Sequence, residues 1–193
     1  MSLLTLLSQT VPLAFAAGLN VYATVAVIGL CEHYHLIALP DQFQTFDNPA
    51  IIGAALVMFG IEFFADKIPW FDSIWDAIHT FVRPIGGALI AVSALGNPSP
   101  TMTALAALIG GSTAMTTHLT KAGTRAAANA SPEPFSNWFL SLGEDILAVS
   151  ISYGALKHPL IALAVAATLL VVIVVFASFL VSAIRRRFAR RPG

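Results

Sequence analysis

Charged residues are scarce in this chain of 193 residues, which has ten Lys and Arg and ten Asp and Glu, together 10% of its residues. Soluble domains usually carry about 25% charged residues and about 45–50% apolar ones. Here 57% of the residues are apolar. A soluble fold of this size could not bury so much apolar surface. The composition therefore predicts an integral membrane protein whose first partner is the lipid bilayer.

Other absences narrow the function. A single cysteine, Cys31, excludes an internal disulfide and a Cys-rich metal site. The net charge of zero lacks the basic excess of a nucleic-acid binder, so no nucleic acid is expected as a partner. The sequence has no Gly-x-Ser-x-Gly, His-Glu-x-x-His, Walker or Rossmann pattern. It thus favours a protein that is not an enzyme, and it indicates no cofactor.

Six segments are predicted to be membrane helices, forming a single all-α transmembrane domain over residues 1–184 with a basic tail over 185–193. The segments are residues 3–30, 49–65, 70–95, 101–117, 132–156 and 159–184. The uncharged stretches after Arg83 and Asp145 are only about a dozen residues long, and a membrane helix needs about 20. Their helices must therefore re-enter the membrane or begin earlier, through charged residues. The pattern Ser131-Pro132-Glu133 favours the earlier start for the fifth helix.

Three stretches share a glycine-rich pattern, which predicts three helical hairpins whose first helix is broken at glycine. The stretches are Gly18–Gly29, Gly86–Pro98 and Gly143–Gly154. We expect Gly86, Gly87 and Gly143 to lie at kinks or close helix contacts. The alternative is that apolar helices rich in Gly, Ala and Val resemble one another by composition alone.

The basic residues predict the orientation. With six spans and both termini on one side, nine of the ten Lys and Arg share that side, and only Lys157 lies opposite. The excess of Lys and Arg in cytoplasmic segments then places both termini in the cytoplasm.

The candidate site residues are polar or charged and cluster in or beside the predicted helices. They are Glu62, Asp66, Lys67, Asp72, Asp76, His79, Arg83, His118, Lys121, Arg125, Asn129, Glu144 and Asp145. Within this set, Asp72, Asp76, His79 and Arg83 have the spacing of one helix face, and apolar residues occupy the other face. That helix either lies on the membrane surface or turns its polar face inward, onto a hydrated path. The short apolar stretch after Arg83 favours the inward orientation.

His118, Lys121 and Arg125 also share one predicted helix face. They form a solvated basic turn, a clamp for a phosphate or carboxylate, or a set of ion-pair partners for the acids. Glu144 and Asp145 fall near the middle of the fifth predicted helix, where an isolated charge costs about 2.5–3.5 kcal/mol. We therefore expect one of them to contact a basic side chain, Lys121, Arg125 or Arg83. Metal binding is left open, because acid and histidine pairs at helical spacing are common by chance.

Several blocks resemble a bacterial integral-membrane family that is known as domain of unknown function 4126. They are Glu62–Pro84, with its DKIP and HTFVRP elements, Lys121–Arg125 and Asn129–Asn137. The resemblance covers most of the chain, from about Gly18 to Pro159. It implies a membrane location, which for this family means the bacterial inner membrane, and it implies no activity.

The central polar set, with Glu133 included, contains four basic and seven acidic residues, a net charge of −3. This balance predicts a transporter or channel for a small charged solute, with a cation or proton favoured over an anion. The alternative is a membrane protein without transport activity that binds lipid phosphate headgroups or scaffolds a partner. A homo-oligomer is compatible with either interpretation.

Overall fold

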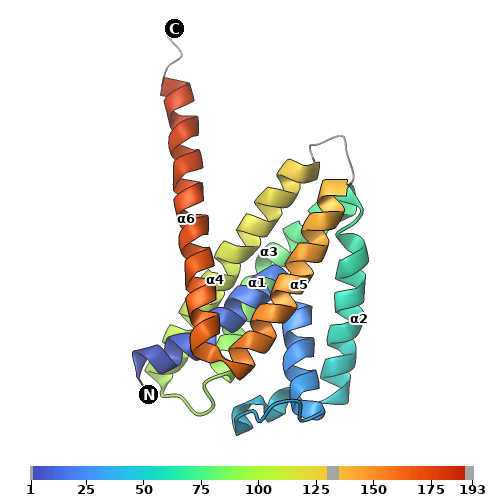
Figure 1. The fold of residues 1–193 in the computed structure, drawn as a ribbon, viewed down its shortest axis with the longest axis vertical. Coiled ribbons are helices and arrows are strands. Elements are labelled where there is room, and N and C mark those ends of the chain that lie inside the picture. Colours follow the sequence, from blue (N-terminus) through green and yellow to red (C-terminus); the bar gives the residue numbers. More distant parts are fainter. Residues whose placement is uncertain (1, 130–134, 190–193) are drawn as a thin grey trace.

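The computed structural model describes residues 2–129 and 135–189. Its elements are α1 (Leu3–His33), the short 3-10 helix η1 (Asp41–Phe46), α2 (Pro49–Ala65), α3 (Pro69–Ser93), α4 (Pro100–Asn129), α5 (Phe135–Lys157) and α6 (Pro159–Ala189) (Figure 1). The described residues contain no strand, so the predicted all-α class is confirmed. Each long helix corresponds to one predicted segment. The fourth runs on to Asn129 instead of ending at Thr117, and the predicted start of the fifth at Pro132 lies outside the described residues.

Prolines and capping side chains set the helix starts. The helices α2, α4 and α6 each begin at a proline, whose missing N–H is not needed in the first turn. Before α2, the Asn48 side chain accepts a hydrogen bond from the Ala50 N–H at 2.9 Å. Such caps satisfy backbone donors that have no partner within the helix. These starts were predictable from local sequence.

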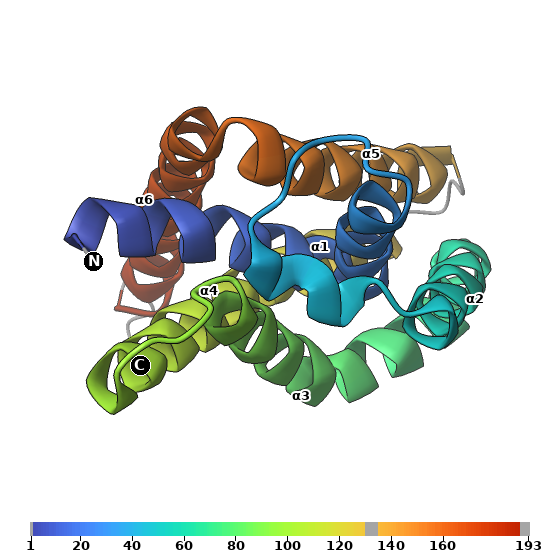
Figure 2. The same ribbon diagram turned by 90° about the horizontal axis from the view of Figure 1, so that it is seen from below.

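The first helix is broken at Asn20. The backbone there is extended, with φ −155° and ψ 101°, so α1 consists of two helical segments, residues 3–19 and 21–33. Each segment is shorter than the roughly 20 helical residues that cross a bilayer. Figures 1 and 2 show that the two segments run in different directions and that the second returns toward the end of the bundle that holds residues 34–48. The start of α1 and the end of α6 lie at opposite ends of the molecule in Figure 1.

The predicted breaks at glycine do not occur in α3 or α5. Both are continuous helices through Gly86, Gly87 and Gly143. Glycine permits an irregular backbone but does not require one, whereas Asn20 has a side chain that caps the next helical segment. The repeat of three broken hairpins is therefore not confirmed.

Small residues let α3 and α4 pack closely. A Cβ added to Gly87 would lie 2.4 Å from the Ala114 Cβ, and one added to Gly110 would lie 2.4 Å from the Ala91 Cβ. Each helix thus presents a small residue, three intervening residues and a second small residue, a common pattern for close helix pairs in membranes. The close contact predicted for Gly87 is confirmed.

The other two glycines of that prediction differ. A Cβ added to Gly86 would lie 2.6 Å from Cγ2 of Val21 in α1, so this contact is confirmed as well. The space around Gly143 is open, with no atom within 4 Å of an added Cβ, and the prediction for it was wrong. Gly143 and Gly53 therefore have the same open environment.

Three described helical stretches are long and apolar enough to cross a membrane by length and composition, and α2 is apolar but shorter. The three are Leu3–His33, Phe135–Lys157 and Pro159–Phe179. Most of Pro159–Phe179 faces outward, with Val171, Val175 and Phe179 more than half exposed. An exposed apolar surface of this kind is typical of contact with lipid. The fold is that of an all-helical membrane protein.

Candidate functional site: a buried ion-pair cluster

The polar face of α3 points into the protein, and its apolar face points outward. Its polar residues Asp72, Asp76, His79 and Arg83 are 1%, 6%, 2% and 0% exposed, while Phe81 on the other face is 74% exposed. A helix lying on a membrane surface would turn its charges to water. The inward orientation of the polar face is therefore observed, and that face meets ionic partners on the neighbouring helices α2 and α4.

Lys121 of α4 lies at the centre of the cluster. Its Nζ donates hydrogen bonds to Glu62 Oε1 at 3.1 Å, to Asp66 Oδ2 at 3.1 Å and to the Leu19 carbonyl at 3.2 Å. A lysine ammonium has three donors, so all of them are used. Lys121 is 2% exposed and is held as an internal counter-ion.

Two arginines extend the cluster on either side of Lys121. Arg83 Nη2 lies 2.6 Å from Glu62 Oε1, and Arg125 Nη2 lies 2.7 Å from Asp66 Oδ2. Arg125 Nη2 also lies 3.2 Å from Asp72 Oδ1. Of the three functions left open for the basic face of α4, the ion-pair role is the one that the structure contains.

The break in α1 supplies backbone acceptors to the same cations. Arg83 Nη1 donates to the Gly18 carbonyl at 3.1 Å, and Lys121 donates to the Leu19 carbonyl. Both carbonyls belong to the last turn before the break at Asn20, where a helix carries partial negative charge. Sequence reasoning missed this part of the site, and only the Gly18-Leu19-Asn20 run hinted at an irregular backbone.

Asn20 joins the break to α5. Its side-chain oxygen accepts the Ala23 N–H at 2.9 Å, which caps the second segment of α1. Its Nδ2 donates to Asp145 Oδ1 at 3.0 Å. One turn further along α1, Thr24 accepts a hydrogen bond from Ser152 of α5 at 3.2 Å. Hydrogen bonds therefore connect the broken part of α1 to Asp145 and Ser152 of α5.

Hydrogen bonds select one neutral form of each of two buried histidines. The Arg83 guanidinium only donates, so His118 Nδ1 accepts from it at 2.9 Å and Nε2–H donates to the Asp76 carbonyl at 3.1 Å. In His79, Nδ1–H donates to the Trp75 carbonyl at 2.7 Å, which leaves Nε2 to accept from a tyrosine hydroxyl at 3.0 Å. That hydroxyl belongs to Tyr22, in the second segment of α1.

The acid pair of α5 has the basic neighbours that the sequence predicted. Glu144 Oε2 lies 3.7 Å from Lys121 Nζ and 3.6 Å from Arg125 Nε. The predicted contact of an acid with Lys121 or Arg125 is confirmed. Both distances exceed those of a hydrogen bond, and Glu144 is thus held more loosely than Glu62 or Asp66.

Lys67 and Asn129 complete the predicted set at the periphery of the cluster. Lys67 Nζ donates to the Phe63 carbonyl at 2.7 Å and lies 3.1 Å from the centre of the Phe63 ring. Burial lowers the pKa of this ammonium, and the negative charge of Asp145 opposes the shift. Asn129 Nδ2 donates to Asp72 Oδ2 at 2.8 Å. The thirteen predicted site residues therefore lie in one region of the bundle, and the bonds of Lys67, His79 and Asp145 run to residues outside the predicted set.

Other polar residues of the cluster were not among the predicted site residues. Arg125 Nη1 donates to the side-chain and backbone oxygens of Asn137 at 2.9 and 3.1 Å, and Asn137 Nδ2 donates to the Asp66 carbonyl at 3.1 Å. Ser141 accepts from Lys67 at 3.4 Å. Asn137 is 2% exposed. The sequence signal that could have identified it is an amide side chain within the fifth predicted helix, because an amide that becomes buried needs hydrogen-bond partners.

Carboxylates outnumber the basic groups. The described cluster contains six carboxylates (Glu62, Asp66, Asp72, Asp76, Glu144 and Asp145) and four basic side chains (Lys67, Arg83, Lys121 and Arg125), a net charge of −2 when all are ionised. The seventh predicted acid, Glu133, lies outside the described residues. Each of the six described carboxylates has one buried oxygen without a hydrogen-bond partner among the described residues, and three of these oxygens, Glu62 Oε2, Asp66 Oδ1 and Asp145 Oδ2, also have no ion-pair partner there. The excess is therefore negative and partly unsatisfied.

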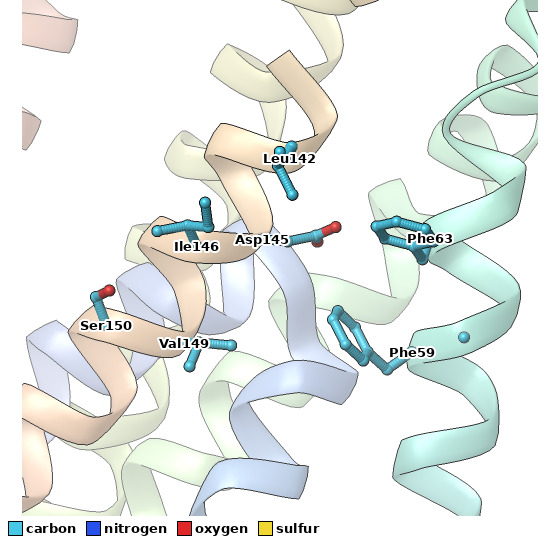
Figure 3. Close-up of a pocket in the computed structure, with 8 residues that line it drawn as sticks. Phe59, Phe63, Leu142, Asp145, Ile146, Val149 and Ser150 are labelled. Atoms are coloured by element: carbon cyan, nitrogen blue, oxygen red, sulfur yellow. The ribbon is translucent and has the colours of Figure 1, made fainter. Parts of the chain in front are cut away.

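A groove of about 520 Å³ lies between α2 and α5, beside the cluster. Its walls are mainly apolar and include Phe59, Phe63, Ile146 and Val149. Figure 3 shows Asp145 pointing from α5 across to Phe63 of α2. The other members of the acid cluster are not among the residues that line this groove. In the part of the chain that the structure describes, no three His, Cys, Asp or Glu side chains are arranged to hold a metal ion.

A family model described as domain of unknown function (DUF4126) matches residues 7–178. The chain belongs to this family. The match spans α1 to α5 and most of α6, so it contains every described member of the cluster. The resemblance seen in the sequence blocks is thereby confirmed, and DUF4126 membership carries no assigned activity. Comparisons with curated proteins and with solved structures give no match.

Proposed function

We propose that this DUF4126 protein is a carrier or channel for a small cation, with the proton included in that class. The observation that carries the proposal is the negative excess of the buried cluster, six carboxylates against four basic side chains. A buried excess of negative charge is costly unless it is compensated by protons or by a cation. Ionisable residues of this kind in membrane proteins commonly mark ion paths and proton relays.

The least firmly paired acids are the best candidates for an exchangeable charge. Glu62 and Asp66 each lie within 3.1 Å of two cations. Glu144 lies more than 3.5 Å from its basic neighbours, and Asp76 Oδ1 lies 4.0 Å from Arg83 Nη2. Among the described residues, the Asp145 carboxylate bonds only to the neutral amide of Asn20. We assign the solute or proton to Glu144 and Asp145, because they are adjacent on α5 and Asp145 lines the groove between α2 and α5, and we assign a framework role to the three cations and their close partners.

The broken α1 supports a transport function. Discontinuous helices at the substrate or ion site recur in secondary transporters, where unwound carbonyls and helix ends face charges. Here the carbonyls of Gly18 and Leu19 face Arg83 and Lys121. A change in those two cations would alter the geometry of Asn20 and, through it, Asp145. This linkage gives the protein a route by which ion binding on α5 can move α1.

The alternative function, binding of lipid phosphate headgroups, has less support. A phosphate clamp needs cations with free donors. Lys121 uses its three donors on protein acceptors. Arg125 pairs with Asp66 and Asp72 and donates to Asn137, and its Nε and Nη2 have no hydrogen-bond partner among the described residues. Both side chains are buried away from the surface where headgroups lie. A scaffolding role has no surface in its favour other than the apolar exterior.

The membrane arrangement is part of the proposal. We propose a multi-pass protein of the bacterial inner membrane with about six helices in or across the bilayer, and with the C-terminal arginines in the cytoplasm. The sequence predicted a cytoplasmic N-terminus too, whereas the start of α1 and the end of α6 lie at opposite ends of the molecule (Figure 1). The labelling experiment in the Discussion tests the sides of residues 41 and 187. Assembly into a homo-oligomer is compatible with the exposed apolar face of α6.

The test is ion flux in proteoliposomes. Wild type, Glu144→Gln and the control Asp41→Asn, which removes an exposed acid of η1, would be reconstituted at equal density. We expect proton, sodium or potassium flux in wild type and in the control, and a loss of about tenfold or more in Glu144→Gln. Absence of flux for all three ions, or equal flux in wild type and Glu144→Gln, would refute the proposal. If Glu144→Gln fails to fold and a charge swap with Lys121 restores folding, the acid is a structural ion-pair partner.

A further inference from the structure

The groove between α2 and α5 has the construction of a binding site. Its volume of about 520 Å³ lies within the range of small-molecule sites, roughly 300–1,000 Å³. It forms because α2 packs on α1 and not on α5, which leaves space between the two helices. Phe59 and Phe63 come from α2, and Leu142, Ile146 and Val149 come from α5. These side chains make a wall suited to an apolar body.

Asp145 is the acidic residue among the mainly apolar residues that line the groove. Asp145 is 4% exposed, and its Oδ1 is held by Asn20. The second oxygen, Oδ2, is buried and has no hydrogen-bond partner among the described residues. Since Asp145 points across the groove toward Phe63 (Figure 3), this oxygen provides an anionic acceptor beside the apolar wall.

Aromatic rings add a second attraction for positive charge. Phe63 already holds the Lys67 ammonium 3.1 Å from its ring centre, so this ring takes part in a cation–π contact. The Lys67 ammonium bonds to the Phe63 carbonyl and Ser141, and it has no ion pair with Asp145 among the described residues. The Asp145 carboxylate thus has no ion-pair partner within 4 Å among the described residues, and the Lys67 charge acts on it from further away.

We propose that the groove binds an amphipathic monovalent cation, whose apolar body lies against the phenylalanines and whose positive group pairs with Asp145. This inference rests on the proposed cation transport and goes beyond it, because it adds an amphipathic solute at Asp145 to the small cations proposed above. The groove opens between two helices with outward-facing apolar residues, so such a solute enters sideways from the bilayer. A small hydrated ion would gain nothing from the apolar wall, whereas a lipid-soluble cation uses both the wall and the acid.

The chain offers a steric test with a matched control. Gly60 lines the groove, and a Cβ added there has no atom within 4 Å. Gly53 of the same helix has the same open environment and does not line the groove. Gly60→Leu should therefore fill the groove without disturbing the packing of α2, and Gly53→Leu should leave the groove unchanged.

The probe is tetraphenylphosphonium, compared with tetraphenylborate, which has nearly the same shape and the opposite charge. Binding to the purified full chain in nanodiscs would be measured by equilibrium dialysis. We expect wild type and Gly53→Leu to bind the cation and not the anion. Asp145→Asn, which keeps an acceptor for Asn20, should lose about tenfold or more in affinity, as expected when a charge-assisted contact is removed. Gly60→Leu should lose binding as well.

The inference is overturned if the two probes bind equally, which would indicate unspecific partition into lipid, or if Asp145→Asn and Gly60→Leu bind like wild type. Flux measurements separate this failure from failure of the proposed function. Flux of protons or metal cations that depends on Glu144, without binding of the phosphonium, would refute the groove and leave transport standing. Specific phosphonium binding without any flux would refute transport and leave the groove as a binding site.

Discussion

Replacement of Lys121 by methionine tests whether the buried cluster holds the helices together. The substitution keeps most of the side-chain length and removes the charge. It takes a cation from Glu62 and Asp66, both 3.1 Å away, and a donor from the Leu19 carbonyl at 3.2 Å. Removing one partner of a buried ion pair leaves an uncompensated charge and typically costs about 3–5 kcal/mol. We expect a loss at the lower end of that range, about 3 kcal/mol, because Arg83 and Arg125 still pair with the two acids.

The charge balance predicts a partial rescue. Lys121→Met takes the described cluster from a net charge of −2 to −3, and adding Glu144→Gln restores −2. Glu144 is only loosely paired, at 3.6 and 3.7 Å, so Glu144→Gln alone should change stability by less than about 1 kcal/mol. In the double variant, about 1 kcal/mol or more of the loss should be regained, since coupled neighbours are not additive.

The assay is reversible unfolding in mixed micelles, followed by circular dichroism as denaturing detergent is titrated. Lys157→Met is the matched control, because this lysine is exposed at the end of α5 and should lose no more than about 0.5 kcal/mol. A loss below about 1 kcal/mol in Lys121→Met would refute the structural role of the cluster. Strict additivity of Lys121→Met and Glu144→Gln would refute the argument from excess charge.

Three further predictions concern the helix packing, the break in α1 and the orientation in the membrane. Gly87→Leu should destabilise the protein by more than about 2 kcal/mol and Gly143→Leu by less than about 0.5 kcal/mol in the same unfolding assay, since only Gly87 lies against α4; equal losses would contradict the packing. Asn20→Leu should cost about 2 kcal/mol or more, the sum of a lost cap and an unsatisfied Asp partner, and a stability equal to wild type would contradict the assigned role of the break. In a chain without its native cysteine, a cysteine at Asp41 should be labelled from outside the cell and one at Arg187 only from inside; labelling of the latter from outside would refute the orientation.

The site residues were predictable because each helix carries its polar residues at regular spacing. Asp72, Asp76, His79 and Arg83 share a face by sequence alone, and the structure buries that face as favoured. The partner of Glu144 followed from the cost of a charge in the membrane. Local rules of this type also gave the helix starts at proline. What they could not give was which helix faces which.

Long-range pairings decided the features that were missed. The fourth predicted segment ended at Thr117, before His118, Lys121 and Arg125, and a solvated basic turn was one of three alternatives for these residues. In the structure these residues are buried by acids from α2, α3 and α5. The basic residues after Thr117 are buried in ion pairs, so α4 continues through them as a helix. No local pattern distinguishes the two cases.

The glycines also show that local sequence does not determine which helices pack together. Gly87 and Gly143 stand in similar sequence, yet Gly87 meets α4 and Gly143 faces open space. The break fell at Asn20, whose partner Asp145 is 125 positions away. A glycine widens the range of backbone conformations and helix contacts that are possible, but it does not select one of them. The neighbours that use this freedom are set by the assembled bundle.

The break in α1 and the excess of acids are consequences of one arrangement. Ending the first segment of α1 inside the bundle leaves the Gly18 and Leu19 carbonyls without helical partners, and such groups in an apolar environment require donors. Arg83 and Lys121 supply them, and two buried cations in turn require carboxylates. Glu62 and Asp66 satisfy that requirement. Asp72 and Asp76 of α3 lie beside Arg125 and Arg83. The two acids of α5 are not needed to balance Arg83 and Lys121, and this is why we place the exchangeable charge of the proposed transport at Glu144 and Asp145.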